Sequence, residues 1–401
     1  MVNSIDDILP VAVGTRLVHI GPPKTGTSAL QGAFHHSRDA LAVHGVEYAG
    51  KLRHSRVAMM AAAYARVPEG YPADAGQRWA RLAKSIQASQ ADRVVLSSET
   101  LAGISEPKIG PFLEAMAGPV HIVITLRPMA SVLASNWQQS IQDEMTLSYD
   151  RWLARTLDPS AGNPAKSAFW RRHNLGHQLD LWIPVVGAEN ITVLVLNPDD
   201  RGMLFAAFEA LVGVPAGTLT PDPRVSNPSF PYDEIEMLRA FNVRFREGGG
   251  SRAEYLKNAR EAVIHRRPLA SIEDPVSASI STPRWAAEAA NAKIRPWVEQ
   301  ARGSGVNVVG DLEHLFADPM KFEPDPIAPS QVGVGEAGDL AHRLYRVGVE
   351  YGVRQGRLAL REELRAEAEA ERLARQAMSS PWSRLRRAAG ILVRSVTRRP
   401  E

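Results

Sequence analysis

The chain has 401 residues, of which 44% are hydrophobic and 23% are charged, a balance that is ordinary for a globular protein with a hydrophobic core. The net charge of +3 is too small to indicate a nucleic-acid partner, and we expect none. The absence of cysteine excludes disulfides, thiolate metal sites and cysteine nucleophiles. The first residues lack a basic start followed by a sustained apolar stretch, and no window approaches the ~20 apolar residues that a spanning helix needs. We therefore expect a cytoplasmic protein.

Short apolar runs rich in β-branched residues alternate with longer helical patterns in the first half of the chain. The predicted strands cover residues 17–20, 93–97, 121–126 and 191–196. Amphipathic stretches at 77–89 and 169–186 predict helices between them, and the chain after Pro231 is mainly helical up to about Trp297. Continuous apolar strands separated by helices indicate an α/β fold, with a mostly parallel central sheet flanked by helices.

The C-terminal part differs in composition from the rest. A Pro-rich, acidic stretch near residues 316–339 interrupts the pattern, and Arg, Glu, Ala and Leu follow it in helical proportions. We expect a main domain at 1–325, a linker at 326–339 and a helical, basic C-terminal extension at 340–401. The last part of that extension, 381–400, carries six arginines and no acid. It could make peripheral contact with an anionic membrane or dock on a partner helix, and a flexible solvated end is the plain alternative.

The segment GPPKTGTSAL, which begins at Gly21, lies between the first predicted strand and a helix. At such a junction, backbone N–H groups and the positive end of the helix dipole converge on an anion. Gly21 and Gly26 have the spacing of a nucleotide triphosphatase loop, but Thr27 stands where that loop has its lysine, and Lys24 lies inside the turn. Thr27 and Ser28 can donate hydroxyl hydrogen bonds to the anion. The plain alternative is a tight turn with Ser28 as a helix cap.

A second polar element follows the predicted strand 121–126. Arg127 ends this strand, and a guanidinium there could hold a phosphate through paired charge-assisted hydrogen bonds. In the helix that follows, one face is apolar and is expected in the core: Met129, Val132, Leu133, Trp137 and Ile141. A polar stripe lies roughly opposite: Ser131, Ser135, Gln138 and Gln142. The alternative is a solvated helix face with an arginine in a surface ion pair.

These two elements together resemble the cofactor motifs of sulfotransferases that use 3′-phosphoadenosine 5′-phosphosulfate (PAPS). The resemblance to that family's 5′-phosphosulfate loop rests on Pro23, Lys24, Thr25, Gly26, Thr27, Ser28 and Leu30. The family's second signature is an arginine that closes a central strand and a serine eight residues later, both on the 3′-phosphate, and Arg127 and Ser135 match it. The resemblance runs from about Arg16 to Leu315. It implies a P-loop-like sulfotransferase fold, PAPS as co-substrate without a metal, and sulfation of a hydroxyl of a saccharide, a glycolipid or another small metabolite.

Such a reaction requires a general base for the acceptor hydroxyl as well as a cation at the leaving oxygen. Lys24 is expected to stabilise the charge that grows on the leaving phosphate oxygen. For the base, Glu99 is the first choice, because it follows the strand 93–97 at the place of the catalytic histidine in cytosolic sulfotransferases. Glu47 and His54 are the other candidates. The plain alternatives are a capping carboxylate, an exposed strand residue and a surface histidine, respectively.

Several alternatives stay open at this point. The chain could instead be a divergent P-loop kinase or nucleotide triphosphatase, or a catalytically silent nucleotide-binding protein. Aromatic residues could stack on sugar rings of an acceptor or belong to the core: Trp137, Tyr149, Trp152 and Trp170. Arg224 could approach the nucleotide, whereas Asn227 and Ser229 are expected to cap the following helix. The acceptor and the oligomeric state are not determined by the sequence.

Overall fold

The structure is a computed structural model, and it describes residues 2–68, 71–158, 167–197, 199–200, 202–222, 230–256, 260, 280–329 and 331–379. Contacts divide the chain into two compact units. The first comprises Met1–Ala253 and Pro268–Gly333, and the second comprises Glu254–Arg267 and Val334–Glu401. The basic tail at 381–400 lies outside the described residues, as do Arg224, Asn227 and Ser229.

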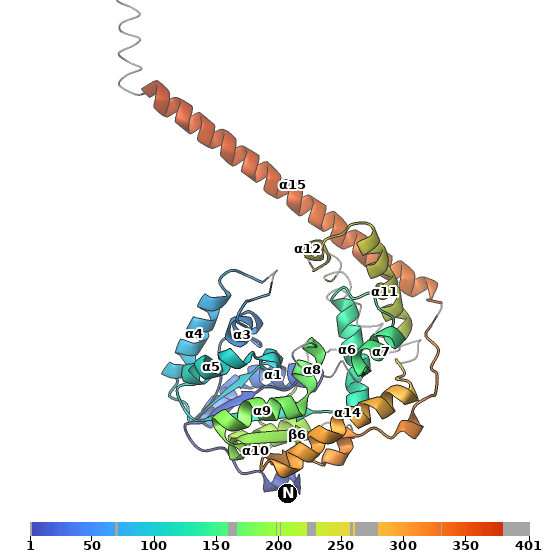
Figure 1. Ribbon diagram of the computed structural model, residues 1–401. Coiled ribbons are helices and arrows are strands. Elements are labelled where there is room, and N and C mark those ends of the chain that lie inside the picture. The colour runs from blue at the N-terminus through green and yellow to red at the C-terminus, as the bar shows by residue number, and fades with distance from the viewer. Residues whose placement is uncertain are drawn as a thin grey trace, which may run out of the picture. The chain divides into compact units, whose positions relative to one another are not determined.

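The first unit is built on a seven-stranded sheet in the order β1-β7-β6-β5-β2-β4-β3, and each pair of neighbours is parallel (Figure 1). The strands are β1 (Val2–Asn3), β2 (Arg16–His19), β3 (Val46–Tyr48), β4 (Arg93–Ser97), β5 (Val120–Leu126), β6 (Ile191–Val195) and β7 (Asn307–Val309). The four strands predicted from the sequence are β2, β4, β5 and β6, each with bounds within one residue. The predicted α/β fold with a parallel central sheet is confirmed.

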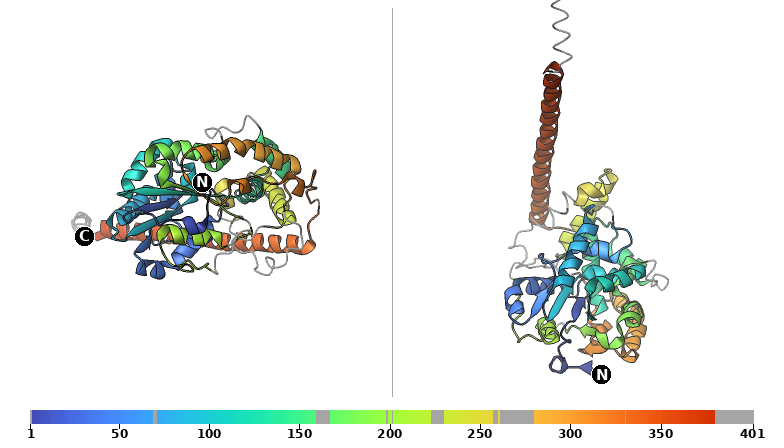
Figure 2. Two further views of the ribbon diagram at one scale, coloured as in Figure 1. Left: turned by 90° about the horizontal axis from the view of Figure 1, so that it is seen from below. Right: turned by 90° about the vertical axis from the view of Figure 1, so that its left-hand side faces the viewer.

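Helices cover both faces of this sheet (Figure 2). The helices that the structure describes in the first unit are α1 (Thr27–His36), α2 (Arg38–Val43), α3 (Arg56–Ala63), α4 (Ala75–Ala88), α5 (Ile109–Met116), α6 (Met129–Gln142), α7 (Tyr149–Leu157), α8 (Ala168–His173), α9 (Leu175–Val186), α10 (Met203–Val212), α11 (Tyr232–Glu247) and α14 (Arg284–Gly303), and the short α12 (Arg252–Glu254) spans the boundary between the two units. The helix predicted at 169–186 is two helices, because Asn174 ends α8 and its side chain accepts a hydrogen bond from the N–H of His177 at the start of α9.

The core on one face of the sheet follows from the alternation of side chains along each strand. Leu17, Val95 and Val123 point to the same face, where they belong to one buried cluster with Phe34 of α1 and Phe208 of α10. The two rings meet edge to face, with centroids 5.9 Å apart. This packing holds α1, and therefore the loop in front of it, against the centre of the sheet.

The connections define a switch point between β2 and β5. From β2 the chain continues to β3 and β4 on one side, whereas from β5 it continues to β6 and β7 on the other. In open parallel sheets, ligands bind outside the carboxyl ends of strands at such a point. The register adds a second feature, since His19 ends β2 opposite Val123 while β5 runs on to Leu126. The last residues of β5 therefore lie beside the loop that follows β2.

The second unit contains α15 (Val334–Ser379), a single helix of 46 residues. Its length corresponds to about 69 Å at 1.5 Å per residue. It begins inside the segment predicted as a linker, 326–339, and the division into domain, linker and extension stays a prediction. Among the helices of the described part of the chain, none combines the length and the apolarity that crossing a bilayer requires.

Three histidines of the first unit are buried: His19, His121 and His173. Burial lowers the pKa of His19 to about 3, of His121 to about 4 and of His173 to about 3, with a smaller contribution from Arg172 to the last. All three are therefore neutral in the folded protein at neutral pH. In the unfolded chain they take up protons near pH 6.5.

We predict that the folded state loses stability as the pH falls from about 6.5 towards 4. In this range the unfolded chain binds protons that the folded chain does not, at a cost of up to about 1.4 kcal/mol per pH unit for each histidine. Urea denaturation between pH 7.5 and 5 measures this slope. A His121→Gln variant, which keeps a polar group next to the Thr192 hydroxyl, should show a shallower slope. Stability that rises on acidification over this range would contradict the prediction.

Candidate functional site

A buried chain of hydrogen bonds joins β2, its two neighbours and the loop after it. His19 Nδ1 lies 2.8 Å from the Ser97 hydroxyl at the end of β4, and Nε2 lies 3.0 Å from the Thr125 hydroxyl of β5. Thr125 Oγ1 is 2.7 Å from Thr25 Oγ1, which donates to the carbonyl of Pro22 at 2.8 Å. The conformation of the loop is therefore tied directly to the centre of the sheet.

The direction of these hydrogen bonds follows because each hydroxyl, and the neutral imidazole, has one proton to donate. The Thr25 hydroxyl gives its proton to a carbonyl, so it accepts from Thr125. Thr125 must then accept from Nε2–H of His19, which leaves Nδ1 to accept from Ser97. The lowered pKa of His19 agrees with this neutral tautomer. Sequence reasoning missed His19, because it read the residue as part of an apolar strand; a histidine within such a strand, two residues before a glycine, was the available signal.

Gly21 allows the loop to pass close to this chain. A Cβ on Gly21 would collide with the Thr125 hydroxyl and the ring of His19, so a larger residue would displace both. Two further residues of the loop have left-handed backbone, Lys24 with φ of 71° and Gly26 with φ of 85°. Glycine adopts this region readily, but for lysine it costs about 1–2 kcal/mol. Strain of this kind at a charged loop residue is typical of functional sites.

The Lys24 ammonium lies half-buried beside α6. Its Nζ donates to Gln139 Oε1 at 3.2 Å, which is a neutral partner. Burial lowers the pKa of Lys24 below its usual value, while the charges of Glu99 and Asp143 act in the opposite direction. Sequence reasoning had not connected Gln139 or Asp143 with the loop. The ammonium thus has one amide partner and two carboxylates in its surroundings, at the carboxyl end of the sheet.

Arg127 follows β5 directly, and its guanidinium reaches the same loop. Its Nη1 donates to the backbone carbonyl of Lys24 at 3.2 Å. The register explains this contact, because β5 extends past the end of β2 and carries Arg127 to the level of the loop. The structure therefore brings together Lys24 and Arg127, which the sequence places 103 residues apart.

The remaining loop residues open α1. Pro23, Thr25 and Thr27 are buried, whereas Ser28 is half-buried. Thr27 Oγ1 is buried and has no hydrogen-bond partner among the described residues. Since the first N–H groups of a helix also lack partners within the helix, unsatisfied donors gather at this end of α1. An anion placed here would satisfy them.

The helix α6 carries the predicted apolar face into the core. Met129, Val132, Leu133, Trp137 and Ile141 are all buried. The opposite stripe is not a solvated face throughout, because Gln138 and Gln142 are buried as well, and Gln138 donates to the carbonyl of Phe230. Ser135 is half-buried, and its hydroxyl donates to the carbonyl of Ser131 at 3.2 Å. The aromatic residues considered for sugar stacking are buried too: Trp137, Tyr149, Trp152 and Trp170.

The three candidates for the base lie in different places. Glu99 begins a 3-10 helix directly after β4, is half-buried, and is close enough to raise the pKa of Lys24. Glu47 lies in β3 opposite Val94, at the amino-terminal end of β4, and accepts a hydrogen bond from the hydroxyl of Ser89. That position is about 10 Å from the carboxyl end of β4, at 3.3 Å per residue.

His54 lies on a surface segment between β3 and α3. It is exposed, and its Nδ1 accepts a hydrogen bond from the Arg53 side chain. Partial desolvation and the charges of Arg53 and Arg56 lower its pKa. Of the three candidates, therefore, Glu99 is the one whose charge acts on Lys24 in the described part of the chain.

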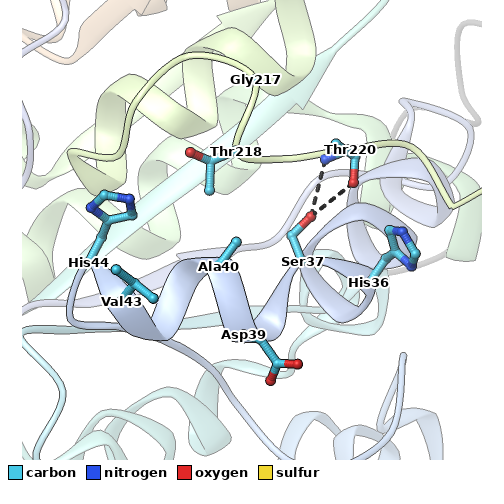
Figure 3. A pocket seen from close by; sticks show the side chains of 9 residues that line it. All are labelled: His36, Ser37, Asp39, Ala40, Val43, His44, Gly217, Thr218 and Thr220. Carbon is cyan, nitrogen blue, oxygen red and sulfur yellow. Dashed lines mark hydrogen bonds between the residues drawn. The ribbon is translucent and has the colours of Figure 1, made fainter.

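The described residues of the first unit enclose at least two cavities. One, of about 580 Å³, lies along α2 and the loop after α10, and Figure 3 shows the Ser37 hydroxyl bonded there to Thr220. No predicted site residue lines it. The other, of about 460 Å³, lies past the carboxyl end of α6 and includes Asp143. The charge of this carboxylate also favours the ammonium form of Lys24, because it raises the pKa of that lysine. The described residues contain no group of three or more His, Asp or Glu side chains placed to hold a metal.

Comparison with known proteins gives limited information. No protein-family model matches the sequence, and no curated protein matches it significantly. Among solved structures, the chain is similar to a sulfotransferase from Alicyclobacillus acidocaldarius, with 20% identity and a TM-score of 0.35 over 65% of this chain and 98% of that one.

We predict that the pKa of Lys24 falls further in a Glu99→Gln variant, because a neighbouring negative charge that favours the ammonium is removed. Reductive methylation with ¹³C-formaldehyde and an NMR titration of the lysine resonances measure this pKa. Glu47→Gln is the matched control and should leave the Lys24 resonance unchanged. A Lys24 whose pKa is at the ordinary value of a lysine, or does not change in Glu99→Gln, would contradict the described site.

Proposed function

We propose that the chain is a sulfotransferase that moves the sulfuryl group of PAPS to a hydroxyl of a saccharide, a glycolipid or another small metabolite. The observation that carries this proposal is the contact between Arg127 and the carbonyl of Lys24. It unites two segments with the residue pattern of the two PAPS motifs, and it lies at the switch point of a parallel sheet.

The residues present fit the two phosphates of such a nucleotide. The unsatisfied Thr27 hydroxyl, Ser28 and the first N–H groups of α1 would hold the 5′-phosphosulfate, together with the ammonium of Lys24. Arg127 and Ser135 would hold the 3′-phosphate, for which a planar guanidinium is well suited. Lys24 would exchange its neutral amide partner for an anion, which is a stronger hydrogen bond.

PAPS supplies a sulfuryl group that is activated by its bond to a phosphate. In the transfer, the bond from sulfur to the bridging phosphate oxygen breaks, a bond from sulfur to the acceptor oxygen forms, and the acceptor proton passes to a base. We assign the base to Glu99, because it is the candidate whose carboxylate is near Lys24. Lys24 lies where it can stabilise the charge on the leaving oxygen, which is the main electrostatic requirement of such a step.

We predict that adenosine 3′,5′-bisphosphate raises the melting temperature of the protein and that ATP with Mg²⁺ does not. A Thr27→Val variant should fold normally, since it removes a hydroxyl without a partner, but it should bind the bisphosphate more weakly, by about tenfold for one hydrogen bond to a charged group. Thermal shift and isothermal titration calorimetry measure both effects. Protection by ATP with Mg²⁺ alone would favour a kinase or triphosphatase, and no protection by either nucleotide would contradict the proposal.

We predict that Glu99→Gln lowers kcat with radiolabelled PAPS by about 10²–10⁴-fold, the usual contribution of a general base, without a comparable change in nucleotide affinity. Glu47→Gln serves as the control, and it should retain turnover, because Glu47 lies at the other end of the strands. A Glu99→Gln enzyme with near-normal kcat would remove Glu99 from this role. The acceptor panel for this assay should contain hydroxylated sugars and small alcohols.

A further inference from the structure

The helix α6 orders the proposed site along one axis. Ser135, Gln139 and Asp143 follow at intervals of four residues, so they lie on one side of the helix about 6 Å apart. Ser135 belongs to the proposed 3′-phosphate site, Gln139 binds the Lys24 ammonium at 3.2 Å, and Asp143 lines the cavity of about 460 Å³. From the amino end of α6 to its carboxyl end, the order is therefore the proposed nucleotide site, then the proposed reacting centre at Lys24, then the cavity.

This order suits an in-line transfer. The acceptor oxygen must approach sulfur from the side opposite the leaving phosphate. With the nucleotide on the amino-terminal side of Lys24, the acceptor would come from the carboxyl-terminal side of α6, where Ser140 and Asp143 line this cavity. Its volume lies within the range of small-molecule sites.

A buried carboxylate next to the cavity, that of Glu144, holds one of the residues that line it. Glu144 has left-handed backbone, with φ of 80°, and follows the end of α6. Its side chain is 5% exposed and pairs with two guanidinium groups, that of Arg246 at 3.3 Å and that of Arg252 at 3.4 Å. The charged residues that line the cavity are Arg155, Arg246 and Asp143, two positive and one negative, which leaves a net charge of +1. Arg246 itself lines the cavity, so its position there is fixed by an ion pair.

A second guanidinium on the wall of the cavity is free. Arg155, in the last turn of α7, lines the cavity, is exposed, and has no hydrogen bond or ion pair with any residue that the structure describes. Ser140 and Thr146 add hydroxyl groups, and Met145 and Leu147 add apolar surface. The one acid that lines the cavity is Asp143, whose charge also acts on Lys24.

We infer that this cavity binds the acceptor, and that the acceptor carries an anionic group, a carboxylate or a phosphate, in addition to the hydroxyl that is sulfated. The inference rests on the proposed function. Arg155 and the preorganised Arg246 bind the anionic group, since guanidinium groups pair with both kinds of oxyanion. The apolar side chains cover the body of the molecule, and Asp143 separates the anion from the Lys24 end of the cavity.

The test uses pairs of probes that differ in one anionic group: D-glucuronate and D-glucose, glycerol 3-phosphate and glycerol, and 4-hydroxybenzoate and 4-hydroxybenzyl alcohol. The methyl NMR signal of ¹³C-labelled Met145 reports occupancy of the cavity without turnover, with and without adenosine 3′,5′-bisphosphate. We expect at least one anionic member to shift this signal with an affinity about tenfold above that of its neutral counterpart. In Arg155→Gln this difference should disappear, whereas Arg151→Gln, on the same helix and outside the cavity, should preserve it.

Turnover with radiolabelled PAPS completes the test. We expect Arg155→Gln to raise KM for the anionic acceptor and to leave kcat nearly unchanged, because the residue binds the acceptor away from the reacting atoms. Equal binding of neutral and anionic probes, or an Arg155→Gln variant with unaltered preference, overturns the inference while the proposed function stands. Failure of the protein to bind adenosine 3′,5′-bisphosphate overturns the proposed function and the inference with it.

Discussion

The site depends on a neutral imidazole in the centre of the sheet. His19 is fully buried, and it bonds to hydroxyl groups on the strands at either side. Each of these polar groups would cost about 1–3 kcal/mol if it were left unpaired in the core, so the whole chain of hydrogen bonds forms or fails as a unit. Because its far end is the Thr25 hydroxyl, the geometry of the loop is set by the same chain. A charged imidazole would disturb both the core and the loop.

The site also contains charged residues with strained backbone. Lys24 and Glu144 are two of the three non-glycine residues with left-handed backbone in the described chain; Lys24 contacts α6 through Gln139, and Glu144 lies two residues after the end of that helix. In both cases polar contacts compensate the strain: Lys24 is held by Arg127 and Gln139, and Glu144 by two arginines. The backbone is therefore held in one conformation at the residues whose charged side chains need a defined orientation, which is a common arrangement at functional sites.

Much of the fold could be predicted because its signals are local. The β-branched runs of β2, β4, β5 and β6 identify buried strands from a few neighbouring residues, and the 3.6-residue period of α6 identifies its core face. The loop could be predicted for the same reason, since glycine, lysine and hydroxyl residues lie within one short segment. Local patterns were less informative for the polar stripe of α6, where packing against Phe230 buries Gln138. They also gave no sign of Asn174 as the boundary between two helices.

What the sequence by itself determined is therefore four of the seven strands of the sheet, the glycine, lysine and hydroxyl residues of the loop, and the presence of Arg127 at the end of a central strand. The tertiary structure decided which of these groups meet. The strand order puts β2 beside β5, the register carries Arg127 to the carbonyl of Lys24, and the same register leaves Glu47 near the amino ends of the strands while Glu99 lies at the carboxyl ends. The physical reason is that contacts between segments a hundred residues apart depend on strand pairing and on the packing of the whole core, for which no short stretch of sequence carries the information.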